Sequence, residues 1–121
     1  MTQEEEQLLI KEIRARLPYG VKGKTLGSKT CTLSYVGEDG SVTADTYHCW
    51  IGSKQFVPYL RPMNLMTSVE KDIYDELYKR LGRGVSYEMF KEFFYTHHLD
   101  WSGFIEKGLA LPAPFGTYEI E

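Results

Sequence analysis

TCTLSYVGEDGS, the stretch from Thr30 to Ser41, decides the fold class of the chain. Apolar and polar residues alternate along its first half, and the less polar side consists of Cys31, Leu33 and Tyr35. This two-residue period is typical of a β-strand with one solvated face. The next four residues, Gly37–Gly40, favour a turn, because Gly40 can adopt the positive φ of a bulged hairpin. The stretch therefore predicts a β-hairpin whose returning strand runs over Ser41–Ile51.

Two neighbouring segments extend the predicted sheet. A strand is expected over Val21–Leu26, before the hairpin. After it, the segment KQFVPYLRPM carries Pro58 and Pro62, and proline cannot donate a hydrogen bond inside a central strand. That segment therefore predicts a short helical turn followed by an edge strand. Residues 19–64 together predict a small, strongly bent antiparallel sheet, either a meander or an SH3-like barrel.

The N-terminal segment predicts a helix over residues 1–18. Thr2 and Glu5 have the spacing of a capping box, and acidic residues in the first turn complement the helix dipole. One apolar stripe at helical spacing consists of Leu9, Ile10, Ile13 and Leu17. Pro18 ends the helix, because it pushes the preceding residue out of the helical region. The stripe should dock on the sheet.

Residues 65–121 predict a helical hairpin with an irregular tail. A second capping box, Thr67 with Glu70, begins one helix, and Ser86 caps the next. The predicted buried stripe of the first helix consists of Ile73, Tyr74, Leu77, Tyr78 and Leu81. The short connection, with Gly82 and Gly84, favours an antiparallel helix pair. The whole chain, residues 1–121, is therefore expected to form a single α+β domain.

Composition narrows the class of protein. A chain of 121 residues can bury a core without disulfides or metals, and its two cysteines, Cys31 and Cys49, are expected to be free thiols. A net charge of -3 argues against a general nucleic-acid coat, which must neutralise many phosphates. The acidic N-terminus resembles neither a secretory signal nor a transit peptide, and no apolar run is long enough to span a membrane. We therefore expect a cytoplasmic protein that does not bind membranes.

The sequence THHLDW, residues 96–101, raises the question of a metal or catalytic site. His97, His98 and Asp100 are the candidate metal ligands. The alternative is structural: His97 lies on the apolar side of its helix and donates to a carbonyl, His98 lies nearer solvent, and Leu99 enters the core. Asp100 then accepts from an imidazole or, more commonly, caps the following turn. We favour this structural interpretation, and the sequence assigns neither a catalytic residue nor a cofactor.

Two groups of residues are candidate contact surfaces for a protein partner or a nucleic acid. Basic residues gather at the C-terminal end of the first helix of the hairpin, at Lys79, Arg80 and Arg83. Tyrosines at 74, 78 and 87 could stack on nucleic-acid bases beside them. The predicted strand edge at Tyr59 and Arg61 is the second candidate.

Two strings, VPYLRPMNLMT and HHLDWSGFIEKGLALPAP, resemble those of a group of small proteins from gut Bacteroidetes and their phages or prophages. The resemblance extends over residues 57–114, about half of the chain, and the group has no assigned activity to transfer to individual residues. The sequence PMNLMT departs from the serine pair expected before the threonine cap, which concerns only that turn. The resemblance implies a protein encoded by a mobile element and working in the bacterial cytoplasm.

These observations favour a non-enzymatic binding or adaptor protein that acts through protein contacts, and the resemblance implies a phage or prophage origin. One alternative is a nucleic-acid-binding accessory protein that uses the small barrel and the edge from Lys79 to Arg83. The other is a small metal-assisted hydrolase centred on His97, His98 and Asp100. Neither the partner nor the oligomeric state follows from the sequence.

Overall fold

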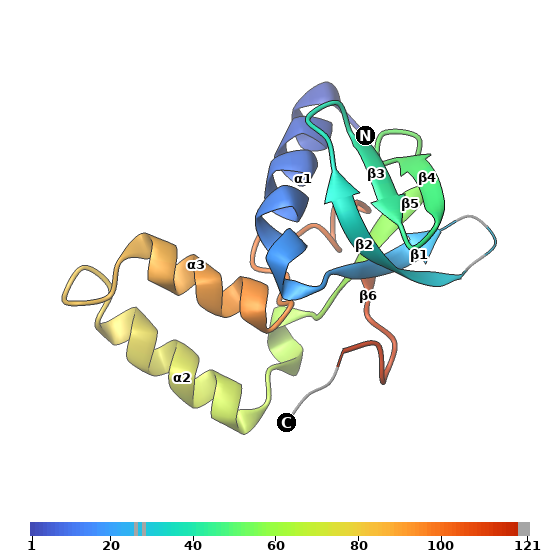
Figure 1. Cartoon of the computed structure of the whole chain (residues 1–121). Helices are drawn as coiled ribbons and strands as arrows, with labels where there is room; N and C mark the ends of the chain where they lie inside the picture. The colour runs from blue at the N-terminus through green and yellow to red at the C-terminus, as the bar shows by residue number, and fades with distance from the viewer. Residues whose placement is uncertain (26, 28, 119–121) are drawn as a thin grey trace.

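The computed structural model describes residues 1–25, 27 and 29–118 and has the predicted α+β fold (Figure 1). Helix α1 spans Gln3–Arg16 and continues into a 3-10 turn, η1, at Leu17–Tyr19. The capping box is present: the Glu5 amide donates to Thr2 Oγ1 at 3.1 Å, and the Thr2 amide donates to Glu5 Oε1 at 2.8 Å. The predicted N-terminal helix is thereby confirmed.

Six strands form one mixed sheet in the order β4-β3-β2-β1-β5-β6. The strands are β1 (Lys22–Thr25), β2 (Thr30–Val36), β3 (Ser41–Ala44), β4 (Tyr47–Trp50), β5 (Phe56–Leu60) and β6 (Leu111–Pro112). All neighbours pair antiparallel except β5 and β6, which are parallel. Leu26, the expected end of the first strand, lies outside the described residues. Figure 1 shows α1 along the sheet and the helical hairpin projecting away from it.

Two details of the predicted hairpin are wrong. The returning strand over Ser41–Ile51 is two strands, β3 and β4, joined by a tight turn in which Asp45 has a φ of 55°. Aspartate tolerates this left-handed conformation better than most residues, so the turn forms without glycine. In β2, a bulge shifts the register between Leu33 and Tyr35. The shift leaves Tyr35 exposed and buries Val36 instead.

Strand β5 lies inside the sheet, contrary to the predicted edge strand. Its pairing with β6 begins at Tyr59, one residue beyond Pro58, so the missing N–H of the proline falls outside that short ladder. On the other side, Gly23 of β1 lies opposite Pro58. A Cβ atom on Gly23 would lie 2.5 Å from the ring of Phe56. Glycine is therefore required for the buried Phe56 ring to cover β1.

The main core lies between α1 and the sheet. Its buried side chains include Leu9, Ile10, Ile13, Val21, Leu33, Val42, Ile51, Phe56, Leu60 and Phe104. Cys31 and Cys49 are also buried there and are free thiols, as expected. Burial raises the pKa of Cys49, which keeps this thiol protonated and unreactive at neutral pH.

A second hydrophobic cluster holds the helical hairpin together. Helices α2 (Ser68–Lys79) and α3 (Tyr87–Thr96) begin at the predicted caps, Thr67 and Ser86, and a 3-10 turn, η2, at Met63–Leu65 precedes α2. The buried residues of this cluster are Phe90, Phe93, Phe94 and Leu99. Tyr74 and Leu77 of α2 pack against them.

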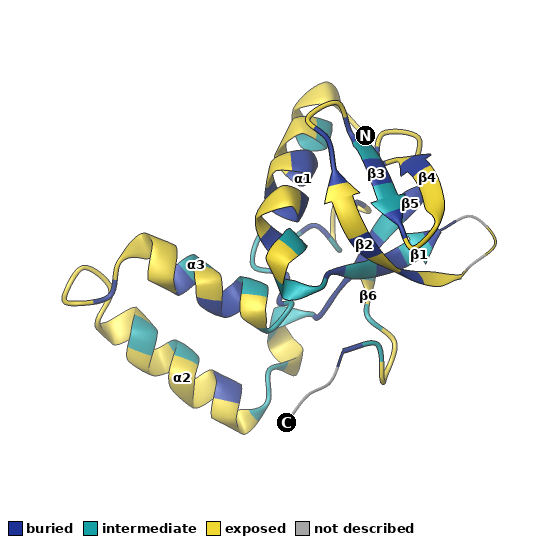
Figure 2. Ribbon diagram, viewed as in Figure 1, coloured by how far each residue is buried: buried dark blue, intermediate teal, exposed yellow. Residues whose placement is uncertain are grey.

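The predicted buried stripe of α2 is covered only in part (Figure 2). Ile73, Tyr78 and Leu81 are exposed, and Val69, one turn before Ile73, is 63% exposed. A pair of helices covers one side of each helix, and the sheet does not lie against the remaining apolar side of α2. The hairpin therefore presents apolar side chains to solvent.

Strand β4 is one of the two edge strands of the sheet, and the backbone of its last residue, Trp50, is hydrogen-bonded within the chain. The Trp50 amide donates to Gln55 Oε1 at 3.1 Å, and the Trp50 carbonyl accepts from the Gln55 amide at 3.1 Å. One glutamine thus occupies both backbone groups of the last residue in the edge strand.

Candidate functional site

A buried ionic network joins the sheet to the hairpin. Both oxygens of Glu70 accept from Arg61, Nη1 to Oε2 and Nη2 to Oε1, each at 2.6 Å. The Arg61 Nη1 atom also donates to the His97 carbonyl at 2.9 Å, and His97 Nδ1 lies 2.9 Å from Glu70 Oε2. Backbone bonds from Arg61 to His98 and Asp100 extend β5 onto the end of α3. Arg61 is therefore the link between the two hydrophobic clusters.

The Glu70 carboxylate is strongly stabilised in its charged form. Burial alone would raise its pKa, but the hydrogen bonds from Arg61 and the Thr67 amide, together with the positive charge of Arg61, lower the pKa to about 2. The Thr67 bond, 2.8 Å long, belongs to the predicted capping box. One carboxylate thus serves both the helix cap and the ion pair.

A second buried ion pair ties α1 to the end of the hairpin. Arg16 Nη2 donates to Glu12 Oε1 at 2.8 Å and to the Leu99 carbonyl at 2.7 Å. The Ser102 hydroxyl donates to Glu12 Oε2 at 2.7 Å. Both charged side chains are at most 5% exposed. The spacing of Glu12 and Arg16, four residues apart on one helix, permits this pair.

The candidate metal ligands face three different partners. His97 contacts Glu70, whereas the ring of His98 stacks on Tyr118 with 3.7 Å between centroids and 9° between planes. The Asp100 carboxylate accepts from the amides of Phe104 and Ile105, at 2.9 Å each. Within residues 1–118, leaving out 26 and 28, no three acidic, histidine or cysteine side chains converge on a possible metal position. The structure therefore does not bring His97, His98 and Asp100 together as one site.

The structural alternative describes these residues better, although the His97 ring faces the Glu70 carboxylate and not a carbonyl as expected. Leu99 is fully buried, and Asp100 caps the following turn, as predicted. His98 differs from the expectation of a solvent-side ring, because Tyr118 covers it. The Tyr118 hydroxyl donates to the Tyr59 carbonyl at 2.7 Å, which fixes the covering ring. Burial, followed by the nearby charges of Arg16 and Arg61, lowers the pKa of His98 to about 4.

The pH dependence of folding tests this placement of His98. The unfolded chain binds a proton at His98 near the ordinary histidine pKa of 6.5, whereas the folded chain does so only near 4, so stability falls as pH falls through this window. The slope approaches about 1.4 kcal/mol per pH unit. Urea unfolding of the wild type and of His98→Gln between about pH 5 and 6.5 measures it, above the range in which carboxylates titrate. Equal slopes in the wild type and in His98→Gln would contradict the neutral imidazole covered by Tyr118.

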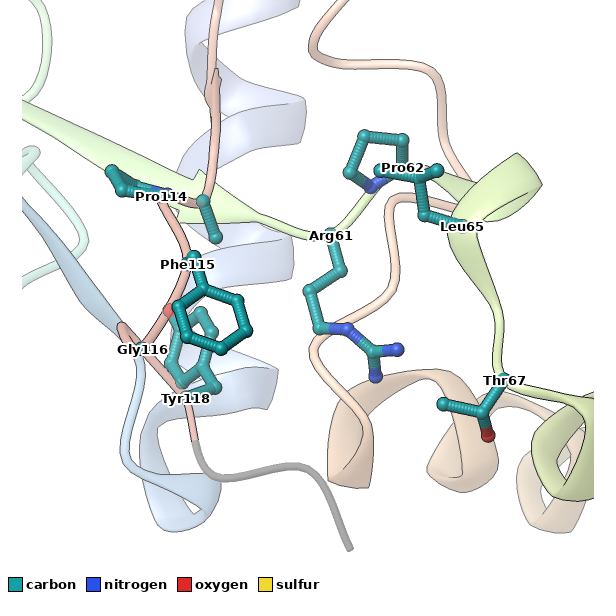
Figure 3. Close-up of a pocket in the computed structure, with 9 residues that line it drawn as sticks. Arg61, Pro62, Leu65, Thr67, Pro114, Phe115, Gly116 and Tyr118 are labelled. Carbon is teal, nitrogen blue, oxygen red and sulfur yellow. The ribbon is translucent and has the colours of Figure 1, made fainter.

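A groove of about 460 Å³ lies beside the ionic network (Figure 3). Figure 3 shows Phe115 and Tyr118 on one side, Pro62 and Leu65 on the other, and the Arg61 side chain between them. The Phe115 ring is fully exposed, and Leu65 is 64% exposed. Sequence analysis missed both residues. Proline on either side of Ala113 favoured an irregular tail, which gives no periodic signal for a binding wall.

The predicted contact residues are placed differently from one another. Tyr59 is buried, and Arg61 lines the groove with its guanidinium held by Glu70. The basic residues at the C-terminal end of α2 and in the following turn are exposed, and they are Lys79, Arg80 and Arg83. Of the three tyrosines proposed to stack on bases, Tyr78 and Tyr87 are exposed, whereas Tyr74 packs in the hairpin cluster.

In the part of the chain that the structure describes, no helix has the length and apolar character needed to cross a membrane. A comparison of the chain with protein-family models, with curated proteins and with solved structures finds no match in any of the three.

Proposed function

We propose that this chain is a non-enzymatic binding or adaptor protein that docks a protein partner in the groove beside Phe115. The fully exposed Phe115 ring at the wall of an apolar groove is the observation that supports the proposal. Exposed aromatic side chains next to a concave apolar surface are typical of binding hot spots. Leu65 continues the apolar surface on the opposite wall.

The chemistry of the walls selects an uncharged partner segment. Arg61 is the charged residue in the described lining, and its bidentate pair with Glu70 already neutralises it. An acidic ligand would therefore have to compete with a buried carboxylate. An apolar segment loses no hydration of charge on entering the groove.

The partner segment binds through side chains rather than by adding a strand. The neighbouring strand β6 is only two residues long and contains Pro112, and Pro114 follows it. Proline has no N–H to donate to an added strand. The occupant is therefore a short extended peptide segment that places aromatic, aliphatic or proline side chains in the groove.

Selection from a yeast-displayed library of random peptides, followed by fluorescence anisotropy with synthetic copies, tests the proposal. We expect uncharged peptides rich in aromatic residues or proline. The Phe115→Ser variant should weaken their binding about tenfold or more, as expected for loss of a hot spot. Met89→Ser, which changes an exposed apolar residue of α3, is the matched control and should leave binding unchanged.

Two results would contradict the proposal. One is the enrichment of charged peptides that bind wild type and Phe115→Ser equally. The other is concentration-dependent self-association that Phe115→Ser abolishes, since the occupant would then be a second copy of the chain. Light scattering over a range of protein concentrations measures the latter.

Nucleic-acid binding is a second candidate function, favoured by the turn end of the hairpin. There the exposed Lys79, Arg80 and Arg83 follow the 63% exposed ring of Tyr78. Cations beside an exposed aromatic ring are the combination that holds single strands. Anisotropy with a labelled single-stranded oligonucleotide should show salt-dependent binding that Arg80→Ala weakens. No binding at low salt would remove this candidate.

A further inference from the structure

The outer face of the sheet carries a second hollow, on strands remote in sequence from the groove. Its volume is about 150 Å³, and its exposed lining includes Tyr35, His48 and Trp50, with Ser41 and Thr43 between them. The register explains this grouping. Tyr35 lies opposite Thr43, Thr43 opposite His48, and Ser41 opposite Trp50, so the side chains share one face of three adjacent strands.

The walls of the hollow are two half-exposed aromatic rings. Tyr35 is 55% exposed and Trp50 is 48% exposed, and these large rings are turned away from the core. The bulge in β2 is the reason that Tyr35 faces outward. The faces of aromatic rings carry negative potential and attract cations. On the neighbouring Tyr47 this attraction is already realised, because the Lys29 ammonium lies 5.4 Å from the centre of that ring.

The Asp39 carboxylate is hydrogen-bonded to Ser41, one of the residues that line the hollow. Asp39 Oδ1 accepts from the Ser41 amide at 3.0 Å and from the Ser41 hydroxyl at 2.6 Å. The Tyr35 hydroxyl belongs to the same cluster, since Asp39 Oδ1, Ser41 Oγ and Tyr35 Oη all lie within 3.2 Å of the position of a Cβ on Gly37. The bonds from Ser41 lower the pKa of Asp39, which keeps it anionic at neutral pH.

The turn that precedes Ser41 carries a second acidic residue. Glu38, next to Asp39, pairs loosely with Arg14 at 3.5 Å, and the Glu38 side chain is 87% exposed. His48 Nδ1 lies 3.2 Å from Thr43 Oγ1, within hydrogen-bonding distance. Two aromatic walls and an oriented carboxylate are complementary to a flat cation.

We propose that this hollow binds an arginine side chain from a basic segment of a protein partner. The guanidinium is planar, weakly hydrated and always charged, so it stacks on an aromatic ring while its N–H groups donate to a carboxylate. The Tyr35 and Trp50 rings provide the stacking surfaces, and Asp39 provides the acceptor. The site is separate from the groove at Phe115, and neither proposal depends on the other.

Titration of the isotope-labelled protein by NMR tests the site. The probe is the peptide acetyl-Gly-Ser-Arg-Ser-Gly-amide, compared with the same peptide carrying lysine or the uncharged citrulline. We expect the arginine peptide to change the NMR chemical shifts of Tyr35, Ser41 and the Trp50 indole. The affinity should decrease from the arginine peptide to the lysine peptide to the citrulline peptide. Asp39→Asn and Trp50→Ala should each weaken arginine binding about threefold or more. Glu38→Gln is the matched control and should keep at least most of the affinity.

Each other outcome overturns the proposal. Equal shifts with the arginine and citrulline peptides would show that charge is not recognised. Shifts confined to other strands would place the site elsewhere. A third outcome is that the arginine peptide does not bind, whereas a thymidine oligonucleotide changes the chemical shifts of Trp50 and binds more tightly to Asp39→Asn. That result would identify a base-stacking surface instead. Because Asp39 and Trp50 are exposed, unchanged thermal unfolding of both variants will confirm that the fold is intact.

Discussion

Glu70→Ala is expected to destabilise the fold by about 3 to 5 kcal/mol, because it leaves the Arg61 guanidinium buried without its counter-charge. In the wild type, Glu70 accepts two bonds of 2.6 Å from Arg61 and one from the Thr67 amide. The variant therefore loses the ion pair, half of the capping box and the contact with His97. Urea unfolding at pH 7 measures the change.

A double variant separates the ion pair from packing. In Arg61→Met with Glu70→Met, no charge remains buried, and the loss should be smaller than for Glu70→Ala alone. The matched control is Glu88→Ala, which removes an 81% exposed carboxylate paired with Lys91 at 3.3 Å and should cost less than about 1 kcal/mol. If Glu70→Ala lost as little stability as Glu88→Ala, the buried network would not be important for the stability of the fold.

The free energy of unfolding at acidic pH also tests the ion pair of Glu70. Because the folded pKa of Glu70, about 2, lies below the ordinary glutamate pKa of 4.5, its contribution to stability is complete above pH 4.5 and is lost as pH falls toward 2. In Glu70→Gln the pH dependence of stability in this range should be weaker. An identical pH dependence in the two proteins would mean that Glu70 titrates normally.

Phe93→Ala or Phe90→Ala should each cost about 3 to 5 kcal/mol, the range for removing a buried phenylalanine side chain. Both rings are 7% exposed and lie in the hairpin cluster. Phe90 meets Tyr74 edge to face at 5.6 Å, and Phe93 lies 4.8 Å from His97. Alanine leaves a cavity that two short helices can close only partly.

His98→Ala provides the comparison for these two variants. The His98 ring stacks on Tyr118 and lies outside the hydrophobic cluster of Phe90 and Phe93, so we expect a much smaller loss of stability than in those two variants. Urea unfolding of all three variants gives the ranking. Equal, small losses at Phe90, Phe93 and His98 would mean that α3 packs through a different side.

The parts of the fold that were predictable are those with local signals. Both capping boxes lie within four consecutive residues, and alternation around Leu33 identifies a strand. The bulge that turns Tyr35 outward has no such signal, because it depends on pairing with β3. The interior position of β5 likewise depends on β6, which comes from the distant tail.

The sites were less predictable because their members are far apart in the chain. Glu70 was recognised as a helix cap, but its partners Arg61 and His97 come from a strand and from the end of another helix. Amphipathic spacing identified the apolar residues of α2 but not which of them would be covered. Tyr74 is packed and Ile73 exposed, and only the position of α3 decides between them.

Gln55 has a consequence for the behaviour of the folded protein at high concentration. Exposed backbone N–H and C=O groups in an edge strand can pair with a strand of a second molecule, which is a first step toward fibrils. Gln55 occupies the amide and the carbonyl of Trp50 within the same molecule. The Trp50 side chain can therefore be exposed at the edge of the sheet while its own amide and carbonyl are not free to pair with a strand of another molecule.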